Sequence, residues 1–312
     1  MTLHTIEPGQ GTLHGSFSRD LPPALTIDAG DTVRFSTLEA GWGLEPRRAD
    51  DAPGRVYSPR VPGRDDGHAL CGPIEIRGAQ PGMVLEVRIE DIRPGTWGWT
   101  SAGARQNELT RKLGVHDAVS IDWTLDVERM LGKDQHGHTV ALRPFMGVMG
   151  MPPAEPGIHS TVPPRFCGGN MDCKELVTGS TLYLPIAVAG ALFSTGDGHG
   201  AQGDGEVSGV AIECPMERVD LTFFLHDDMH ITTPRANTPT GWVTLGFNID
   251  LHEATVIALS AMLDLIEELY HMPRAEALAM ASVVVNLHIS QIVNGNMFGV
   301  HAVLPHYALQ AL

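Results

Sequence analysis

The chain has 312 residues, of which 43% are hydrophobic and 19% charged, and it contains 35 glycines and 22 prolines. That length suits one large core or two or three closely packed small domains, and the glycine and proline content favours short strands joined by turns. The formal net charge is −16 and the basic residues are scattered, which argues against nucleic acid and anionic membranes as partners.

The sequence also carries signals about location. No apolar run is long enough to span a membrane, and the first residues have neither a basic flank nor an apolar stretch, so we expect no membrane span and no signal peptide. The four cysteines form no CxxC pair and are too few for a disulfide framework in a chain of this length. We therefore expect the protein in the reducing cytoplasm.

The N-terminal part reads as strands and long loops. In residues 84–92 the apolar side chains Leu85, Val87 and Ile89 alternate with charged ones, which predicts a strand with one solvent-exposed face. Shorter runs of the same kind occur at 24–28, 32–36 and 73–77. The stretches around 40–65 and 93–118 have no period, so we expect loops that cross the sheet and line a site.

Further along the chain, strands give way to helices. Strands are predicted at 181–188, 207–212, 219–225 and 242–249. Asp250 and Glu253 then have the spacing of a helix cap, and apolar residues at helical spacing predict a helix over 252–270. A second helix is expected to open at Pro273 and to run to about 281. A hairpin of 283–289 and 297–304 around Asn294-Gly295 completes the chain.

These elements predict a mainly β protein, with a sandwich-like or barrel-like body and a small α+β subdomain near the C-terminus. We assign residues 1–249 to the body and 250–312 to a helix–helix–hairpin module packed on it. A body made of two packed β subdomains, divided near 120–180, is the alternative.

The densest polar cluster lies at residues 194–206, where glycines alternate with Asp197, His199, Asp204 and Glu206. Residues two apart in extended chain face the same way, so each pair is expected to project into one space. Imidazole and carboxylates together suit Zn²⁺ and similar ions, and a carboxylate left off the metal can act as a general base. The alternatives are a flexible acidic loop or a Ca²⁺ loop without catalysis.

Three further residues are candidates for the site. Asp172, in Cys167-Gly-Gly-Asn-Met-Asp-Cys-Lys174, is a natural additional carboxylate ligand, although an Asx turn that enters a strand explains it equally well. His68 and His159 follow glycine-containing turns and could serve as a ligand or as an acid/base group. A histidine taken alone is more often a surface residue, or a buried one whose hydrogen bonds are made within the protein.

Several of these motifs together resemble the acetamidase/formamidase family. The resemblance covers nearly the whole chain, and its motifs are Gly72-Pro-Ile74 with Gly78-Ala-Gln-Pro-Gly82, Gly168-Gly-Asn-Met-Asp172, Gly179-Ser-Thr-Leu-Tyr-Leu-Pro185, and Gly196-Asp-Gly-His with Gln202-Gly-Asp-Gly-Glu206. It implies a mostly β homo-oligomer, a homodimer or larger, that hydrolyses short linear amides to carboxylate and ammonia with a bound divalent metal.

The mechanism expected from these residues is metal-assisted hydrolysis of a small neutral amide. We assign His199, Asp172, Asp197 and His68 as ligands of a divalent ion, Zn²⁺ before Ca²⁺, that polarises the carbonyl and activates water. Glu206 or Asp204 would carry the proton to the leaving nitrogen, with His159 as a further catalytic candidate. The pocket should be small and walled by residues 97–99 or 146–151.

Two other functions remain open on the sequence. The same site could act on another C–N bond, such as that of a larger amide or a urea-like compound. A non-catalytic metal-binding β module is the rival from another class, because runs such as Ala29–Phe35 also occur in cupredoxin-like domains. The Cys, His and Met set that such a copper site needs near the C-terminus is absent.

Overall fold

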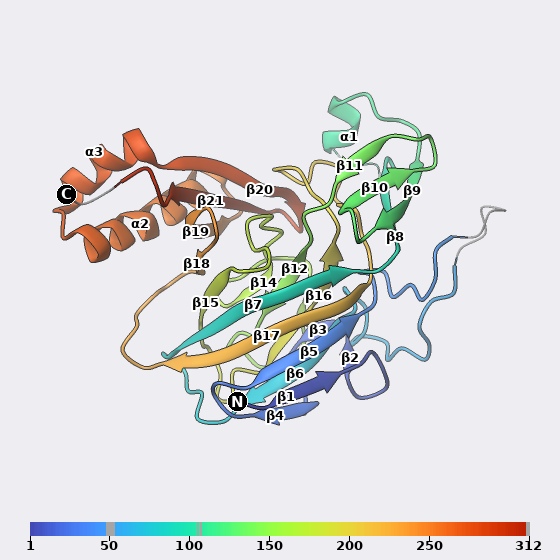
Figure 1. The fold of residues 1–312 in the computed structure, drawn as a ribbon, viewed down its shortest axis with the longest axis horizontal. Helices are drawn as coiled ribbons and strands as arrows, with labels where there is room; N and C mark the ends of the chain where they lie inside the picture. Colours follow the sequence, from blue (N-terminus) through green and yellow to red (C-terminus); the bar gives the residue numbers. More distant parts are fainter. Residues whose placement is uncertain (48–53, 105, 107, 310–312) are drawn as a thin grey trace.

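Strands dominate the computed structural model, which describes residues 1–47, 54–104, 106 and 108–309 (Figure 1). The helices in these residues are α1 (Glu108–Lys112), α2 (Leu251–Tyr270) and α3 (Arg274–Val284). Neither α2, the longest of them, nor a shorter helix combines the length and apolarity needed to cross a membrane.

The largest sheet has nine strands and runs from the N-terminal strand to the C-terminal hairpin. Its order is β1-β5-β17-β7-β15-β18-β19-β21-β20, and its pairs are antiparallel except for β1 with β5. The bounds are β1 Leu3–Ile6, β5 Thr32–Thr37, β17 Met216–His226, β7 Val84–Pro94, β15 Thr181–Pro185, β18 Arg235–Asn237, β19 Gly241–Asn248, β21 Met297–Pro305 and β20 Asn286–Asn294.

A second sheet has the order β14-β12-β16-β6-β2, with β4 paired to β6. Its bounds are β14 Gly168–Asn170, β12 Phe145–Gly150, β16 Phe193–His199, β6 Leu70–Ile76, β2 Leu13–His14 and β4 Leu25–Ile27. Every residue of β12 and β16 is buried. Neither strand therefore has a solvent-exposed face, which would appear in the sequence as alternating apolar and polar residues.

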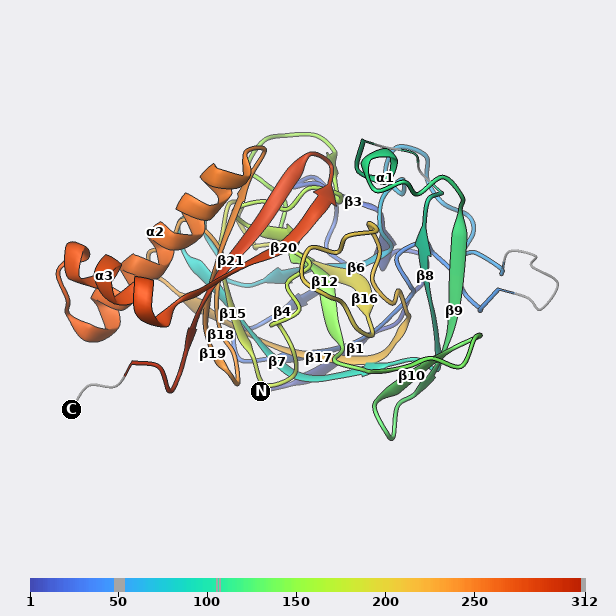
Figure 2. The ribbon, with the colours of Figure 1, turned by 90° about the horizontal axis from the view of Figure 1, so that it is seen from above.

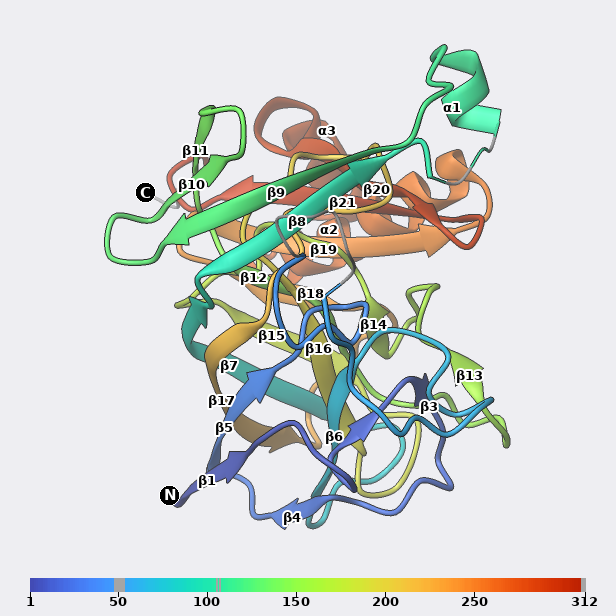
Figure 3. The same cartoon turned by 90° about the vertical axis from the view of Figure 1, so that its right-hand side faces the viewer.

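A four-stranded sheet of order β11-β10-β9-β8 stands beside these two, at the right of Figures 1 and 2. Its strands are β11 Thr139–Ala141, β10 Leu131–Asp134, β9 Val119–Asp126 and β8 Trp97–Ala102. A short pair joins β13 (His159–Ser160) to β3 (Ser16–Phe17). Figure 3 shows the paired strands β8 and β9 above β7, β17, β5 and β6 in that view.

The main core lies between the two larger sheets. Phe223 on β17 and Phe193 on β16 are fully buried and make an edge-to-face contact with ring centroids 5.1 Å apart. Their neighbours in one continuous apolar cluster are Val33, Phe35, Leu85, Val87 and Leu221 from the nine-stranded sheet, and Cys71, Ile74, Ile76, Met146 and Met149 from the second. Two sheets packed face to face make the body a β-sandwich, as the sequence predicts.

The C-terminal module also follows the prediction closely. The Asp250 side chain accepts hydrogen bonds from the backbone N–H groups of His252 and Glu253, which caps α2. The helix then packs its buried side on β19 and β21, where a separate apolar cluster forms around Met262 and Ile266. The hairpin β20–β21 belongs to the nine-stranded sheet, so the module and the body share one sheet.

Some predicted elements are wrong. Residues 207–212 form turns and bends rather than a strand, because a hydrogen bond from the Gly209 N–H to the Glu206 carbonyl closes a turn there. Ser208 and Val210 line a cavity. The segment 93–118, expected to be a loop, contains β8 and α1. Its tryptophan and threonine residues were compatible with a strand, but the surrounding glycines concealed the period.

Candidate active site

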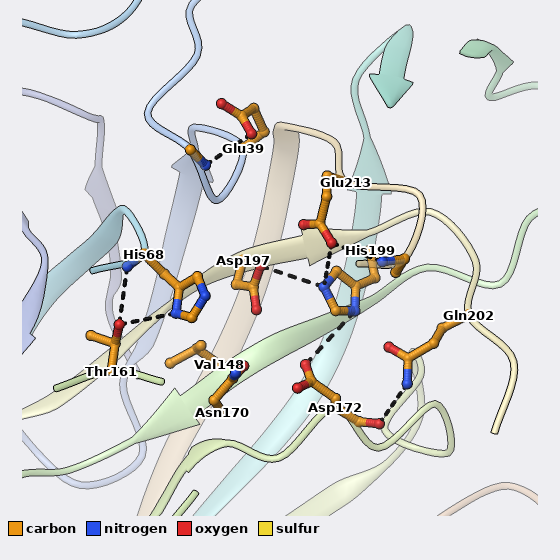
Figure 4. A network of polar contacts seen from close by, with 12 residues as sticks. Glu39, His68, Val148, Thr161, Asn170, Asp172, Asp197, His199, Gln202 and Glu213 are labelled. Atoms are coloured by element: carbon orange, nitrogen blue, oxygen red, sulfur yellow. Dashed lines mark hydrogen bonds and ion pairs between the residues drawn. The ribbon is translucent and has the colours of Figure 1, made fainter. Parts of the chain in front are cut away.

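His199 lies at the end of β16 with carboxylates on both sides of its ring (Figure 4). Its Nε2 is 3.4 Å from Oδ1 of Asp197 and 3.4 Å from Oε1 of Glu213, and its Nδ1 is 3.9 Å from Oδ1 of Asp172. The four side chains are buried. The expectation that Asp197 and His199 project into one space is confirmed.

Glycine on the neighbouring strand makes room for this group. A Cβ at Gly147 of β12 would lie 2.5 Å from Oδ2 of Asp197, 2.7 Å from Oδ1 of Asp172 and 2.9 Å from Cε1 of His199. The Gly147 carbonyl also accepts a hydrogen bond from the Asp172 N–H at 3.3 Å. One glycine therefore both provides the space and positions a carboxylate.

The C-terminal hairpin contributes to the site through Asn294. Its Nδ2 donates a hydrogen bond to Oδ2 of Asp172, and the residue is the last of β20. Asp172 is thereby held between the turn after β14 and the opposite end of the chain. The sequence offered no signal for this contact beyond the Asn294-Gly295 turn, because the two residues are 122 positions apart.

Glu213 is the second residue that the sequence did not single out. It was taken as the exit of a strand, but its backbone bridges both Trp99 and His199. Its Oε1 also accepts a hydrogen bond from Ala211 N–H at 2.9 Å. The neighbouring Cys-Pro turn hides this role, because a lone glutamate at a turn is ordinary.

Three of these acidic residues have unusual backbone conformations. Asp172, Asp197 and Glu206 have φ values of 45°, 60° and 44°, in the left-handed region that favours glycine. They account for three of the nine non-glycine residues with positive φ in the described parts of the chain. Each costs on the order of 1–3 kcal/mol, and such strain typically concentrates at functional sites.

Burial and mutual charge dominate the electrostatics of the cluster. Burial raises the pKa of Asp172 to about 7, and burial together with the charge of Asp172 raises the pKa of Glu206 well above its ordinary value. Burial also acts on Asp197, but the charge and the hydrogen bond of His199 outweigh it and lower its pKa. The carboxylates Glu213 and Asp197 outweigh burial at His199 and raise its pKa.

A cavity of about 530 Å³ opens onto this cluster, larger than the small pocket expected from the sequence. Asp197, Glu206 and Glu213 line it from the inside. Trp99 belongs to its wall, as one of the two predicted loops implied. Residues 146–150 instead belong to the buried strand β12, and none of residues 146–151 lines the cavity.

The second half of the glycine-rich motif divides its two carboxylates. Glu206 joins Asp172 and His199 in a group whose ligand atoms lie within 4.8 Å of one another. Asp204 turns away, with Oδ2 2.9 Å from Lys174 Nζ and 2.9 Å from His288 Nδ1. The segment is a turn here rather than a second extended piece, so the two side chains do not share a face.

The two other histidine candidates lie apart from the ligand groups. His68 lines the cavity and contacts Thr161, but it belongs to neither group around His199. His159 lies on β13 at the surface, where its Nε2 bonds the Glu155 carbonyl, and it does not line the cavity.

The residues around His199 fit a divalent metal. The buried atoms Nδ1 and Nε2 of His199, Oδ1 of Asp172, Oε2 of Glu206 and Oε2 of Glu213 have no hydrogen-bond partner among the described residues. Buried polar atoms are rarely left unpaired. The two 3.4 Å separations at Nε2 are long for hydrogen bonds. They match the separation of about 3.3 Å between two ligands of a tetrahedral zinc with bonds of about 2.0 Å.

Comparison with known proteins places these features in one family. The sequence profile of the Acetamidase/Formamidase family matches residues 4–160 and 154–309. A "Putative formamidase" of Schizosaccharomyces pombe is 29% identical over an alignment that covers 77% of this chain and 74% of the relative.

Solved structures share the fold. An acetamidase from Bacillus halodurans superposes with a TM-score of 0.82 at 25% identity, covering 96% of this chain and 97% of its own. The "predicted acetamidase/formamidase" of Thermoanaerobacter tengcongensis gives a TM-score of 0.84 at 24% identity, covering 98% and 96%. Because the profile spans almost every described residue, including each acidic residue around His199, the chain belongs to the acetamidase/formamidase family of amide hydrolases.

Proposed function

We propose that the protein hydrolyses short linear amides to a carboxylate and ammonia in the cavity beside His199. The observation that carries the proposal is a buried imidazole with a carboxylate near each nitrogen, and neither nitrogen has a hydrogen-bond partner in the described part of the chain. The names of the similar proteins, formamidase and acetamidase, support the substrate class.

A divalent ion would be held by Nε2 of His199 together with Asp197 and Glu213. Asp172 would accept the Nδ1–H on the other side of the ring and fix its orientation, as carboxylates behind ligating histidines commonly do. Imidazole nitrogen among the donors favours Zn²⁺ over Ca²⁺. When bound, such an ion supplies positive charge that stabilises the negative charge developing on the substrate carbonyl oxygen.

Glu206 is the proposed general base, since it lines the cavity and its buried Oε2 has no hydrogen-bond partner within the described ranges. It takes a proton from the attacking water as the new C–O bond forms on the carbonyl carbon. It returns that proton to the amide nitrogen, so that the C–N bond breaks and ammonia leaves. Asp204 and His159 are not placed to do this, because both are engaged elsewhere.

A larger amide is the second candidate substrate, and the cavity volume of about 530 Å³ favours it. Cavities of roughly 300–1,000 Å³ accommodate ligands much bigger than acetamide. Assembly into a homodimer or larger homo-oligomer, and a cytoplasmic location, stay predictions from the sequence.

The test is ammonia release from formamide, acetamide, propionamide, benzamide and urea. We expect turnover of at least one of the amides, and a loss of about 100-fold or more in Glu206→Gln, because general bases contribute about 10²–10⁴-fold. Asp204→Asn, in the same motif but outside the cavity around His199, is the matched control and should stay within about 3-fold of the wild type. A folded wild-type protein that releases no ammonia from any of these compounds would refute the proposal.

A further inference from the structure

Asn170 presents an unsatisfied acceptor at the cavity. The residue ends β14, is 3% exposed and lines the cavity beside Asp197. Its Nδ2 donates a hydrogen bond to the Val162 carbonyl at 3.1 Å, and its Oδ1 has no partner among the described residues. Rotating the amide by 180° would put two oxygens against each other, so the bond to Val162 fixes which end is the acceptor. Figure 4 shows the side chain pointing toward Asp197.

His68 presents the complementary group, a donor. The Thr161 hydroxyl accepts a hydrogen bond from the His68 backbone N–H at 3.0 Å and lies 2.9 Å from His68 Nδ1. Thr161 is fully buried, and among the described residues its hydroxyl hydrogen has no other acceptor than Nδ1. Nδ1 therefore accepts, which leaves Nε2 to carry the ring hydrogen.

We propose that Asn170 and His68 form an amide-reading pair that selects unsubstituted carboxamides, –CONH2, as substrates. Oδ1 of Asn170 accepts a hydrogen bond from the substrate –NH2 group, and Nε2–H of His68 donates one to the substrate carbonyl oxygen. The inference rests on the proposed amide hydrolysis and adds to it the residues that recognise the scissile group.

This pairing has consequences for what the cavity rejects. An N,N-dialkyl amide or an ester has no N–H for Oδ1 of Asn170, which would stay buried and unpaired. The carboxylate product also has no hydrogen to offer, and its second oxygen replaces the nitrogen that Asn170 contacted. Sites built to bond a substrate N–H strongly reject analogues that lack it. The same acceptor thus favours binding of the amide and release of the acid.

The test compares two ligands in one variant. In Asn170→Leu, which is similar in size but has no acceptor, we expect kcat/KM for formamide to fall about 10–100-fold. The inhibition constant of N,N-dimethylformamide, measured against formamide hydrolysis, should stay the same or fall, because that molecule makes no hydrogen bond to Oδ1 and leaves it unpaired in the wild type. Any structural cost of losing the Val162 contact would weaken both ligands alike. Equal losses for the two ligands would overturn the role of Asn170.

The donor role of His68 has its own control. His68→Gln keeps an N–H donor and an acceptor for Thr161, whereas His68→Leu keeps neither. We expect Gln to retain at least about 10-fold more kcat/KM for formamide than Leu, with the metal content of both unchanged. Equal activity in the two variants, or metal lost from both, would overturn the donor role and make His68 a structural residue or a ligand.

Failure of this inference differs from failure of the proposed function. A wild-type protein without amide hydrolysis overturns both. An active wild type whose Asn170→Leu variant keeps the same preference for formamide over its dimethyl analogue overturns the inference alone.

Discussion

The imidazole of His199 divides the acidic residues into two sets. Asp197 and Glu213 lie at Nε2, and Asp172 lies at Nδ1. One histidine normally gives a metal one nitrogen and uses the other to bond an orienting carboxylate. In the proposed mechanism the two sets therefore have different roles, and the ion would lie on the Nε2 side, between Asp197 and Glu213, which both line the cavity.

Substitutions on the two sides should separate these roles. Asp197→Ala and Glu213→Ala should lose stoichiometric zinc, whereas Asp172→Asn should weaken zinc affinity by about 10–100-fold and still bind it. Metal titration of each purified variant, with zinc counted per chain, measures the difference. Retention of zinc by Glu213→Ala together with its complete loss from Asp172→Asn would instead place the ion at Nδ1.

A second residue-scale prediction concerns His14, which belongs to neither group around His199. Burial lowers its pKa to about 4 from 6.5, and its ring bonds the Ser16 carbonyl and the Ser194 hydroxyl. At a pH between 4 and 6.5, His14 binds a proton in the unfolded chain but not in the folded protein. The contribution of the neutral His14 to the free energy of unfolding is therefore fully present above pH 6.5. It is lost as the pH drops toward 4, by about 3 kcal/mol in total.

Urea unfolding at pH 7.5, 5.5 and 4.5 tests this dependence. His14→Asn keeps polar groups for both contacts but does not titrate, so its stability should depend less steeply on pH than that of the wild type. The same slope in both proteins would show that His14 is not responsible.

Part of the site could be predicted from the sequence at this scale. Asp197 and His199 were expected to converge because they are two residues apart in extended chain, and they do. Glu213 and Asn294 could not be found this way, because contacts between segments far apart in the sequence bring them to the site. Asp204 shows where this reasoning fails. It is two residues from Glu206, as Asp197 is from His199, but Asp204 lies in a turn and not in extended chain.

At the scale of elements, β12 determines how closely the acidic groups can approach. Alanine at Gly147 would place its Cβ against two carboxylates and the imidazole, whose positions the surrounding strands fix. We expect Gly147→Ala to lose zinc and at least about 10-fold of amidase activity, since sub-ångström misplacement of ligands is costly. Gly203→Ala, in open space within the glycine-rich motif, should leave both unchanged. Metal content and ammonia release measured on the two variants compare them directly, and equal effects would refute the steric role.

The elements with a clear period were the predictable ones. The capped helix α2 and the hairpin around Asn294-Gly295 lie close to their expected ranges, because local capping and turn chemistry determine them. Strand β8 was missed because glycine and tryptophan gave it no alternation. Residues 207–212 contain the β-branched side chains Val207, Val210 and Ile212, but Ser208, Gly209 and Val210 line a cavity and the segment pairs in no sheet.

At the scale of the whole molecule, the C-terminal hairpin connects the body to the site. β21 pairs with β19 of the body, β20 ends at Asn294 beside Asp172, and Ser290 accepts a hydrogen bond from the Gly205 N–H. A division of the chain at residue 249 would cut the nine-stranded sheet and remove the donor to Asp172.

We therefore expect residues 1–249 expressed alone to lack amidase activity, and residues 250–312 alone to lack stable structure. Ammonia release from the first fragment and circular dichroism of the second measure this. An active 1–249 fragment would show that the two parts are independent domains.

The most direct test of the account is amidase activity counted against bound metal. Purified protein is assayed for ammonia release from acetamide and formamide with its zinc content known, then after chelation, and again after zinc is added back. The account predicts activity that falls in proportion to the zinc removed and returns when zinc is restored. Full activity in metal-free protein would contradict it.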